Sequence, residues 1–141
     1  MDNKVKVIFK AISENESFAR NVVSCFALNF NPSIALLNDI KTAVSEAVTN
    51  CIVHGYPNEV GEITLEIECI GDELHINVID DGVGIENLEQ AIEPFYTTKP
   101  DEERSGMGFT IMKSFMDDVR VESSINNGTK VYMKKKLMLD A

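Results

Sequence analysis

The sequence contains no tryptophan, two histidines and three cysteines, and it has no apolar run long enough to cross a membrane. Cations are also scarce, because 13 lysines and arginines face 23 aspartates and glutamates, for a net charge of −10. Phosphate backbones are bound by clustered cations, so this balance argues against nucleic acid as a direct partner. The first residues lack the apolar segment of a secretory signal. We therefore expect a cytoplasmic protein that binds neither a membrane nor nucleic acid.

The cysteines are odd in number, and each lies within an apolar pattern: Cys25, Cys51 and Cys69. This usage is typical of buried free thiols and disfavours a disulfide framework or a metal site. With 141 residues and 44% hydrophobic content, the chain is long enough to bury one core. We therefore predict a single domain over residues 1–141.

Hydrophobic periodicity predicts a strand over residues 5–12 and then a helix to about residue 29. Ser13 and Glu16 have the spacing of a capping box at the start of this helix. Apolar side chains recur every four residues along it and are predicted to form one buried stripe: Phe18, Val22, Phe26 and Phe30.

A second helix is predicted from Ile34 to His54, with Ser33 as its N-cap and Gly55 as a left-handed stop. Two alternating strands flank a turn at residues 70–73 and should form a hairpin. A third helix is predicted to start near Gly108, and two more strands close the chain. This order predicts an α/β (α+β) two-layer sandwich, in which helices cover one face of a mostly antiparallel mixed sheet.

Glu46 and Asn50 are four residues apart in the second predicted helix and therefore share one face. Asparagine is a middling helix former, so a mid-helix asparagine indicates a role such as binding Mg²⁺ through its carboxamide oxygen. Glu46 lies one turn earlier and is suited to act as a general base beside a phosphate. The alternative is a solvated polar face without a chemical role.

The sequence Asp80-x-Gly82-x-Gly84 directly follows a predicted strand. Here the Asp80 carboxylate could accept a hydrogen bond from the exocyclic amine of adenine, and the glycines would let the backbone approach the base. Asp81 should point away, because neighbouring strand residues alternate. The alternative is an ordinary turn at the end of a strand.

A second glycine pair, Gly106-x-Gly108, opens the third predicted helix, where exposed amides and the helix dipole favour a phosphate group. The polar loop that precedes it, residues 94–105, carries Lys99 and Arg104 and suggests a mobile cover over a nucleotide. Neither glycine pair has the spacing of a Walker motif or of a dinucleotide-binding fingerprint.

Four motifs occur in one order, and together they resemble the Bergerat-type ATPase fold shared by gyrase, Hsp90, histidine kinases and MutL: Glu46-x-x-x-Asn50, Asp80-x-Gly82-x-Gly84, Gly106-x-Gly108 and Gly128-Thr129. The resemblance implies that Asp80 contacts adenine, Asn50 ligates Mg²⁺, Thr129 supports Asp80, and residues 94–105 form the ATP lid. The implied nucleotide-binding set also includes Gly82, Gly84, Thr97, Thr98, Lys99, Arg104, Ser105, Gly106, Met107, Gly108 and Phe109.

Three longer segments, residues 50–57, 94–100 and 103–112, are similar to the anti-sigma F factors of spore-forming bacteria, and the likeness extends over nearly the whole chain. It implies a homodimer that binds and silences a sporulation sigma factor, sigma F. It also implies an ATP-dependent serine kinase that phosphorylates an anti-anti-sigma partner, with Glu46 as the catalytic base and with ATP and Mg²⁺ as cofactors.

Alternatives to this function stay open at this point. One is the related stress-response kinase that controls sigma B, and another is a binding module in which ATP only shapes the sigma-binding surface. A histidine kinase catalytic domain is less favoured, because the chain has no room for a separate helix pair that carries a phospho-acceptor histidine.

Glu16 and Arg20 are four residues apart on the first predicted helix. They can form an exposed ion pair within the helix, which is worth about 0.3 to 0.5 kcal/mol. Alternatively they belong to a partner-binding surface, where the planar guanidinium of Arg20 would pair with a carboxylate of the sigma factor or of the anti-anti-sigma protein.

Overall fold

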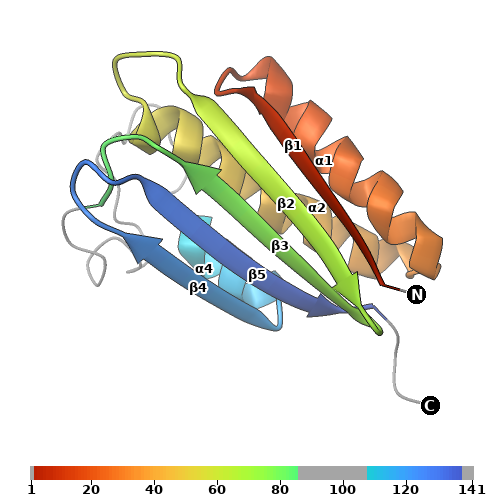
Figure 1. Cartoon of the computed structure of the whole chain (residues 1–141). Helices are drawn as coiled ribbons and strands as arrows, with labels where there is room; N and C mark the ends of the chain where they lie inside the picture. Colours follow the sequence, from red (N-terminus) through yellow and green to blue (C-terminus); the bar gives the residue numbers. More distant parts are fainter. Residues whose placement is uncertain (1, 86–107, 138–141) are drawn as a thin grey trace.

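Five strands form one sheet in the order β1-β2-β3-β5-β4 (Figure 1). The structure is a computed structural model that describes residues 2–85 and 108–137. The strands are β1 (Asn3–Lys10), β2 (Glu62–Ile70), β3 (Glu73–Asp80), β4 (Asp118–Ser123) and β5 (Thr129–Lys136). All four strand pairings are antiparallel, so the described sheet contains no parallel pair of the kind that a mixed sheet would have.

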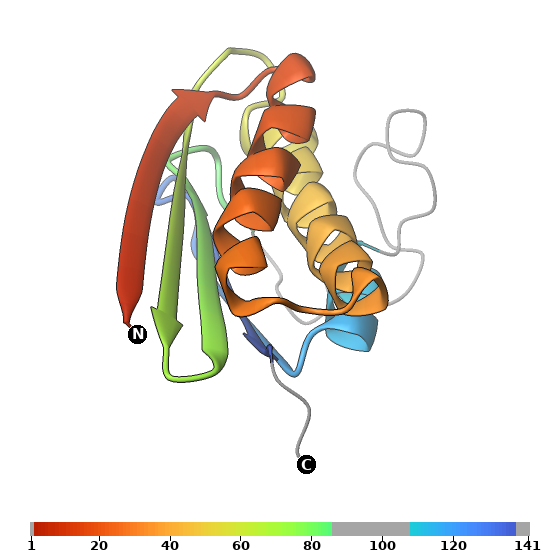
Figure 2. The same cartoon turned by 90° about the vertical axis from the view of Figure 1, so that its right-hand side faces the viewer.

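The helices pack on one face of this sheet, and no described helix lies on the other face (Figure 2). They are α1 (Glu14–Ala27), α2 (Ile34–Asn50), α4 (Gly108–Phe115), the short 3-10 helix η1 (Leu28–Phe30) and the π-helical turn η2 (Cys51–Gly55). The arrangement confirms the predicted two-layer fold. Within residues 2–85 and 108–137, no helix combines the length and hydrophobicity that a bilayer crossing requires.

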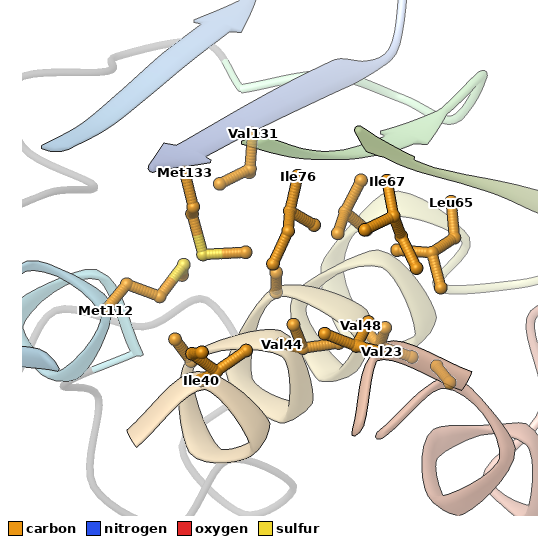
Figure 3. Close-up of a cluster of buried hydrophobic side chains, with 14 of the residues drawn as sticks. Val23, Ile40, Val44, Val48, Leu65, Ile67, Ile76, Met112, Val131 and Met133 are labelled. Carbon is orange, nitrogen blue, oxygen red and sulfur yellow. The ribbon is translucent and has the colours of Figure 1, made fainter. Parts of the chain in front are cut away.

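The core lies between the sheet and the helices, where side chains from both layers point toward one another (Figure 3). Ile40, Val44 and Val48 of α2 are fully buried beneath Ile67 and Ile76 of the sheet. Burial of each such side chain contributes about 1.5 to 3 kcal/mol relative to exposure. This packing fixes α2 across the middle of the sheet, and α2 carries Glu46 and Asn50.

The predicted core stripe of α1 is wrong at its N-terminal end. Phe18 is 45% exposed and touches Phe9 only edge to face, whereas the buried residues of the helix are Ala19, Val23, Phe26 and Ala27. A strict four-residue repeat drifts around a helix that has 3.6 residues per turn, so Phe18 and Phe26 cannot both face the core squarely.

The predicted capping box is also wrong. Ser13 has helical backbone angles, and its side chain makes no capping hydrogen bond. The carboxylate of Glu16 instead accepts a hydrogen bond of 2.5 Å from the Ser45 hydroxyl on α2. Tertiary contact between α1 and α2 thus replaces the local cap. The predicted cap of α2 is confirmed, because Ser33 Oγ accepts from the Leu36 amide at 3.1 Å.

Gly55 does not end α2 as a left-handed residue; among the described glycines, positive φ occurs at Gly71, Gly84 and Gly128. The helix passes instead into η2, and the Tyr56 amide donates to the Cys51 carbonyl at 3.1 Å. The hairpin of β2 and β3 is confirmed. All three cysteines are free as predicted, but Cys25 is exposed while Cys51 and Cys69 are buried.

Candidate nucleotide-binding site

Asp80 is a buried carboxylate at the end of β3, with only 4% of its surface exposed. The Gly82 amide donates to its Oδ1 at 2.9 Å, and the Thr129 amide and the Cys51 thiol lie near enough to favour the charged carboxylate. Burial raises the pKa of Asp80 above that of an ordinary aspartate, and the hydrogen bonds offset this only in part. Asp81, the next residue, is exposed, as strand alternation predicts.

Three glycines allow separate segments to meet around Asp80. A Cβ atom on Gly55 would lie 2.9 Å from Asp80 Oδ2, and one on Gly82 would lie 1.9 Å from the Gly55 carbonyl oxygen. A Cβ atom on Gly128 would lie 2.0 Å from the backbone oxygen of Asp80. The end of η2, the end of β3 and the turn before β5 therefore converge at backbone contact distance. Sequence reasoning treated Gly55 only as a helix stop and missed this contact.

Thr129 is opposite Asp80 in the β3–β5 register, and its backbone amide lies on the side of the carboxylate, where it helps to lower the Asp80 pKa. Its hydroxyl instead lies 2.7 Å from the Ser123 hydroxyl. Ser123 Oγ also accepts from the Ile85 amide at 2.8 Å and donates to the Gly128 carbonyl at 2.9 Å. Ser123 thus ties the loop after Asp80 to the start of β5, a role that sequence motifs did not reveal.

The phosphate end of the predicted site also comes together in the structure. A Cβ atom on Gly108, at the start of α4, would lie 3.3 Å from both amide atoms of Asn50 and 3.4 Å from Glu46 Oε2. The N-terminal end of α4 therefore faces the carboxylate and the carboxamide on α2. Helix N-termini favour anions, so a phosphate group placed there would lie beside both side chains.

Asn50 Nδ2 is buried and has no hydrogen-bond partner among the described residues. Leaving such an atom unpaired costs about 1 to 3 kcal/mol, so a ligand that supplies a partner would be stabilised. A 180° rotation of the amide would place its oxygen at this position, and an amide oxygen is a ligand that suits Mg²⁺. The donor chemistry at Asn50 therefore fits the predicted cation.

The remaining predicted residues are placed as follows. Phe109 is 8% exposed and packs in the core, so only its backbone can reach a nucleotide. Gly84 has φ of 76° and packs against the Ser124 carbonyl. The others lie outside the described residues: Thr97, Thr98, Lys99, Arg104, Ser105, Gly106 and Met107.

Glu16 and Arg20 do not form the ion pair that their spacing allows. Glu16 is bonded to Ser45, and Arg20 Nε is buried without a hydrogen-bond partner in the described part of the chain. The guanidinium is half-buried on α1 rather than neutralised by its neighbour one turn away. A carboxylate of another molecule could therefore reach Arg20 only through the terminal nitrogens of its guanidinium, because Nε is buried.

Comparisons with known proteins identify the family of the chain. Residues 9–135 match the sequence model of the histidine kinase-like ATPase domain. The RsbU and RsbW domains of a Mycobacterium tuberculosis protein superpose with a TM-score of 0.72, over 99% of this chain and 34% of that one. At 18% identity, this likeness shows a shared fold. The matched residues span most of the chain, which therefore belongs to the family of histidine kinase-like ATPase domains.

Three relatives place the chain more narrowly. It is 54% identical to an anti-sigma F factor of Clostridium acetobutylicum, over 99% of this chain and 97% of the relative. Identity to the anti-sigma F factor of Clostridium perfringens strain SM101 is 56%, over 97% and 99% of the two chains. Identity to the anti-sigma F factor of Thermoanaerobacter pseudethanolicus is 53%, over 94% of this chain and 93% of the relative. The chain belongs to the anti-sigma F factor family, as its motifs indicated.

Proposed function

We propose that this protein binds and inhibits sigma F, and that it uses Mg·ATP to phosphorylate a serine of its anti-anti-sigma partner. The observation that carries the kinase proposal is the convergence of Glu46 and Asn50 on the start of α4, where a Cβ atom on Gly108 would lie within 3.4 Å of both side chains. The sigma F target is supported by the names of relatives at 53 to 56% identity. We further expect a homodimer that acts in the cytoplasm.

The adenine end of the proposed ATP site is Asp80. An ionised carboxylate has about four positions that accept hydrogen bonds. The Gly82 amide donates to Asp80 Oδ1, so acceptor capacity remains on the carboxylate for a further donor. The exocyclic amine of adenine is a donor of the required kind. Guanine presents an oxygen at the same ring position, so this site would favour adenine.

The phosphate end is the start of α4 together with Asn50 and Glu46. Asn50 would hold Mg²⁺, which neutralises charge on the phosphates when it is bound. Glu46 would accept the proton of the attacking serine hydroxyl. The serine oxygen would then bond to the γ-phosphorus, and the bond from that phosphorus to the oxygen that leaves with ADP would break. Positioning of the two reactants and electrostatic stabilisation of the phosphoryl group account for most of the rate enhancement in such transfers.

An assay of phosphate transfer tests this proposal. The protein is incubated with γ-labelled ATP, Mg²⁺ and candidate anti-anti-sigma proteins, and phosphoserine is measured in the partner. We expect transfer to a partner that controls sigma F, and inhibition of transcription that depends on sigma F. ATP binding without transfer would favour an ATP-gated binding module, and transfer confined to a sigma B pathway partner would favour the stress-response kinase.

Replacing Arg20 by alanine should weaken binding to the sigma factor or to the anti-anti-sigma protein by about tenfold or more, which corresponds to about 1.4 kcal/mol. The reason is that Glu16 is bonded to Ser45 and does not pair with Arg20, and the terminal nitrogens of the guanidinium can pair bidentately with a carboxylate. Surface plasmon resonance with each partner would measure the loss. ATP affinity and melting temperature should hardly change, and normal affinity for both partners would place the docking surface elsewhere.

A further inference from the structure

Tyr56 directly follows the π-helical turn η2, and its hydroxyl joins two strands. The oxygen accepts a hydrogen bond from the Asp81 amide at 2.7 Å and donates one to the Glu62 carbonyl at 2.7 Å. Only 7% of the residue is exposed. The hydroxyl is therefore a bridge, sheltered from solvent, between the end of β3 and the start of β2.

The position of this bridge in the sheet is informative. The β2–β3 register pairs Ile63 with Asp80, so one further step would place Asp81 opposite Glu62. The Tyr56 hydroxyl lies between the amide and the carbonyl of these two residues. The hydroxyl thus takes the place of the next backbone pairing and ends the β2–β3 ladder immediately after Asp80. The residues that follow Asp80 can then turn toward η2.

The tyrosine itself is held in place. A Cβ atom on Gly61 would lie 2.1 Å from the ring, so glycine is required for the close approach of the backbone to one ring edge. The Tyr56 amide is bonded to the Cys51 carbonyl. On the far side of the turn, the Val83 amide donates to the Gly55 carbonyl at 2.9 Å. The turn that directly follows Asp80, residues 81–83, is therefore attached to Tyr56 at its first residue and to η2 at its last.

We propose that Tyr56 is a positioning residue for the nucleotide site, which sets the orientation of the Asp80 carboxylate by ending the strand ladder at that residue. The inference rests on the proposed binding of ATP through Asp80. It assigns Tyr56 no contact with the nucleotide. Its effect should therefore appear in the recognition of the adenine amine rather than in contacts to the phosphates.

The test compares ATP with inosine triphosphate, which carries an oxygen in place of the exocyclic amine. Affinities are measured by displacement of a fluorescent ATP analogue from the full-length protein and from Tyr56→Phe. We expect ATP affinity to fall by about tenfold in the variant, the scale of one hydrogen bond to a charged group. Inosine triphosphate affinity should stay nearly unchanged, so the ratio of the two affinities should shrink.

A matched control is Tyr132→Phe. The Tyr132 hydroxyl lies 2.8 Å from His75 Nδ1 on the helix-free face of the same sheet, so this variant also loses a partly buried tyrosine hydroxyl, with one hydrogen bond where Tyr56→Phe loses two. Its affinity ratio should equal that of the unmodified protein, whatever happens to its melting temperature. If Tyr56→Phe is unstable, the titrations are repeated in the cold with trimethylamine oxide, which favours the folded state.

The outcomes separate this inference from the proposed function. An unmodified protein that fails to bind ATP would overturn the proposed function itself. If it binds and prefers ATP but Tyr56→Phe keeps the same preference, only the positioning role is overturned. An equal loss of affinity for both nucleotides would also overturn it, because the tyrosine would then act on stability alone.

Discussion

Replacement of Glu46 by glutamine should slow phosphotransfer by a factor of about 10² to 10⁴, the usual contribution of a general base. Glutamine keeps the size of the side chain and removes its ability to accept a proton. Glu46 Oε2 would lie only 3.4 Å from a Cβ atom on Gly108, at the end of α4 where we place the phosphates. Single-turnover transfer of labelled phosphate to the partner measures the effect.

ATP binding should survive in Glu46→Gln, since the adenine end of the site is untouched. The informative comparison is Asn50→Ala, one helical turn away on the same face of α2. That variant should weaken Mg²⁺-dependent nucleotide binding instead, because it removes the proposed cation ligand. If Glu46→Gln transfers phosphate at the normal rate, Glu46 is not the base.

The second large effect should follow from Asp80→Asn, which we expect to weaken ATP binding by about 10- to 100-fold. A hydrogen bond to a charged group contributes about 1.5 to 3 kcal/mol, and each 1.4 kcal/mol is one decade in affinity. Asparagine offers one acceptor oxygen where the carboxylate offers two. Asp80 Oδ1 already accepts a hydrogen bond from the Gly82 amide, so the loss of the other oxygen removes the acceptor that we assign to adenine.

Asp81→Asn is the matched control, because it makes the same chemical change one residue away on an exposed side chain. Its backbone amide, which is bonded to Tyr56, is unaltered by the substitution. We expect almost normal ATP affinity. The titrations need an extrinsic fluorescent nucleotide, since the chain has no tryptophan. Equal losses of ATP affinity in the two variants would show that Asp80 does not recognise adenine.

Much of the site could be predicted because its chemistry depends on short local patterns. Helical spacing alone places Glu46 and Asn50 on one face, and strand alternation alone separates the buried Asp80 from the exposed Asp81. Both arrangements hold in the structure. The layered fold could be predicted for the same reason, since the periods of strands and helices are local properties of the chain.

The errors occur where a long-range contact competes with a local preference. Glu16 was predicted to cap its own helix, but it bonds to Ser45 on α2. Gly55 was predicted to provide a left-handed stop, but what it provides is space for the Asp80 carboxylate. In both cases the residue type was informative, and the partner could not be identified because it lies 25 or more residues away in the chain.

By itself, the sequence determined the elements, the order of the motifs and the chemistry available at Glu46, Asn50 and Asp80, because these depend on periods and residue types. Only the tertiary structure decided which backbone segments meet around Asp80 and which hydroxyls hold them there. Tyr56 and Ser123 belong to no motif, and their roles arise from hydrogen bonds between residues that are distant in sequence. Such contacts depend on the packing of the whole core, which positions α2 against the sheet.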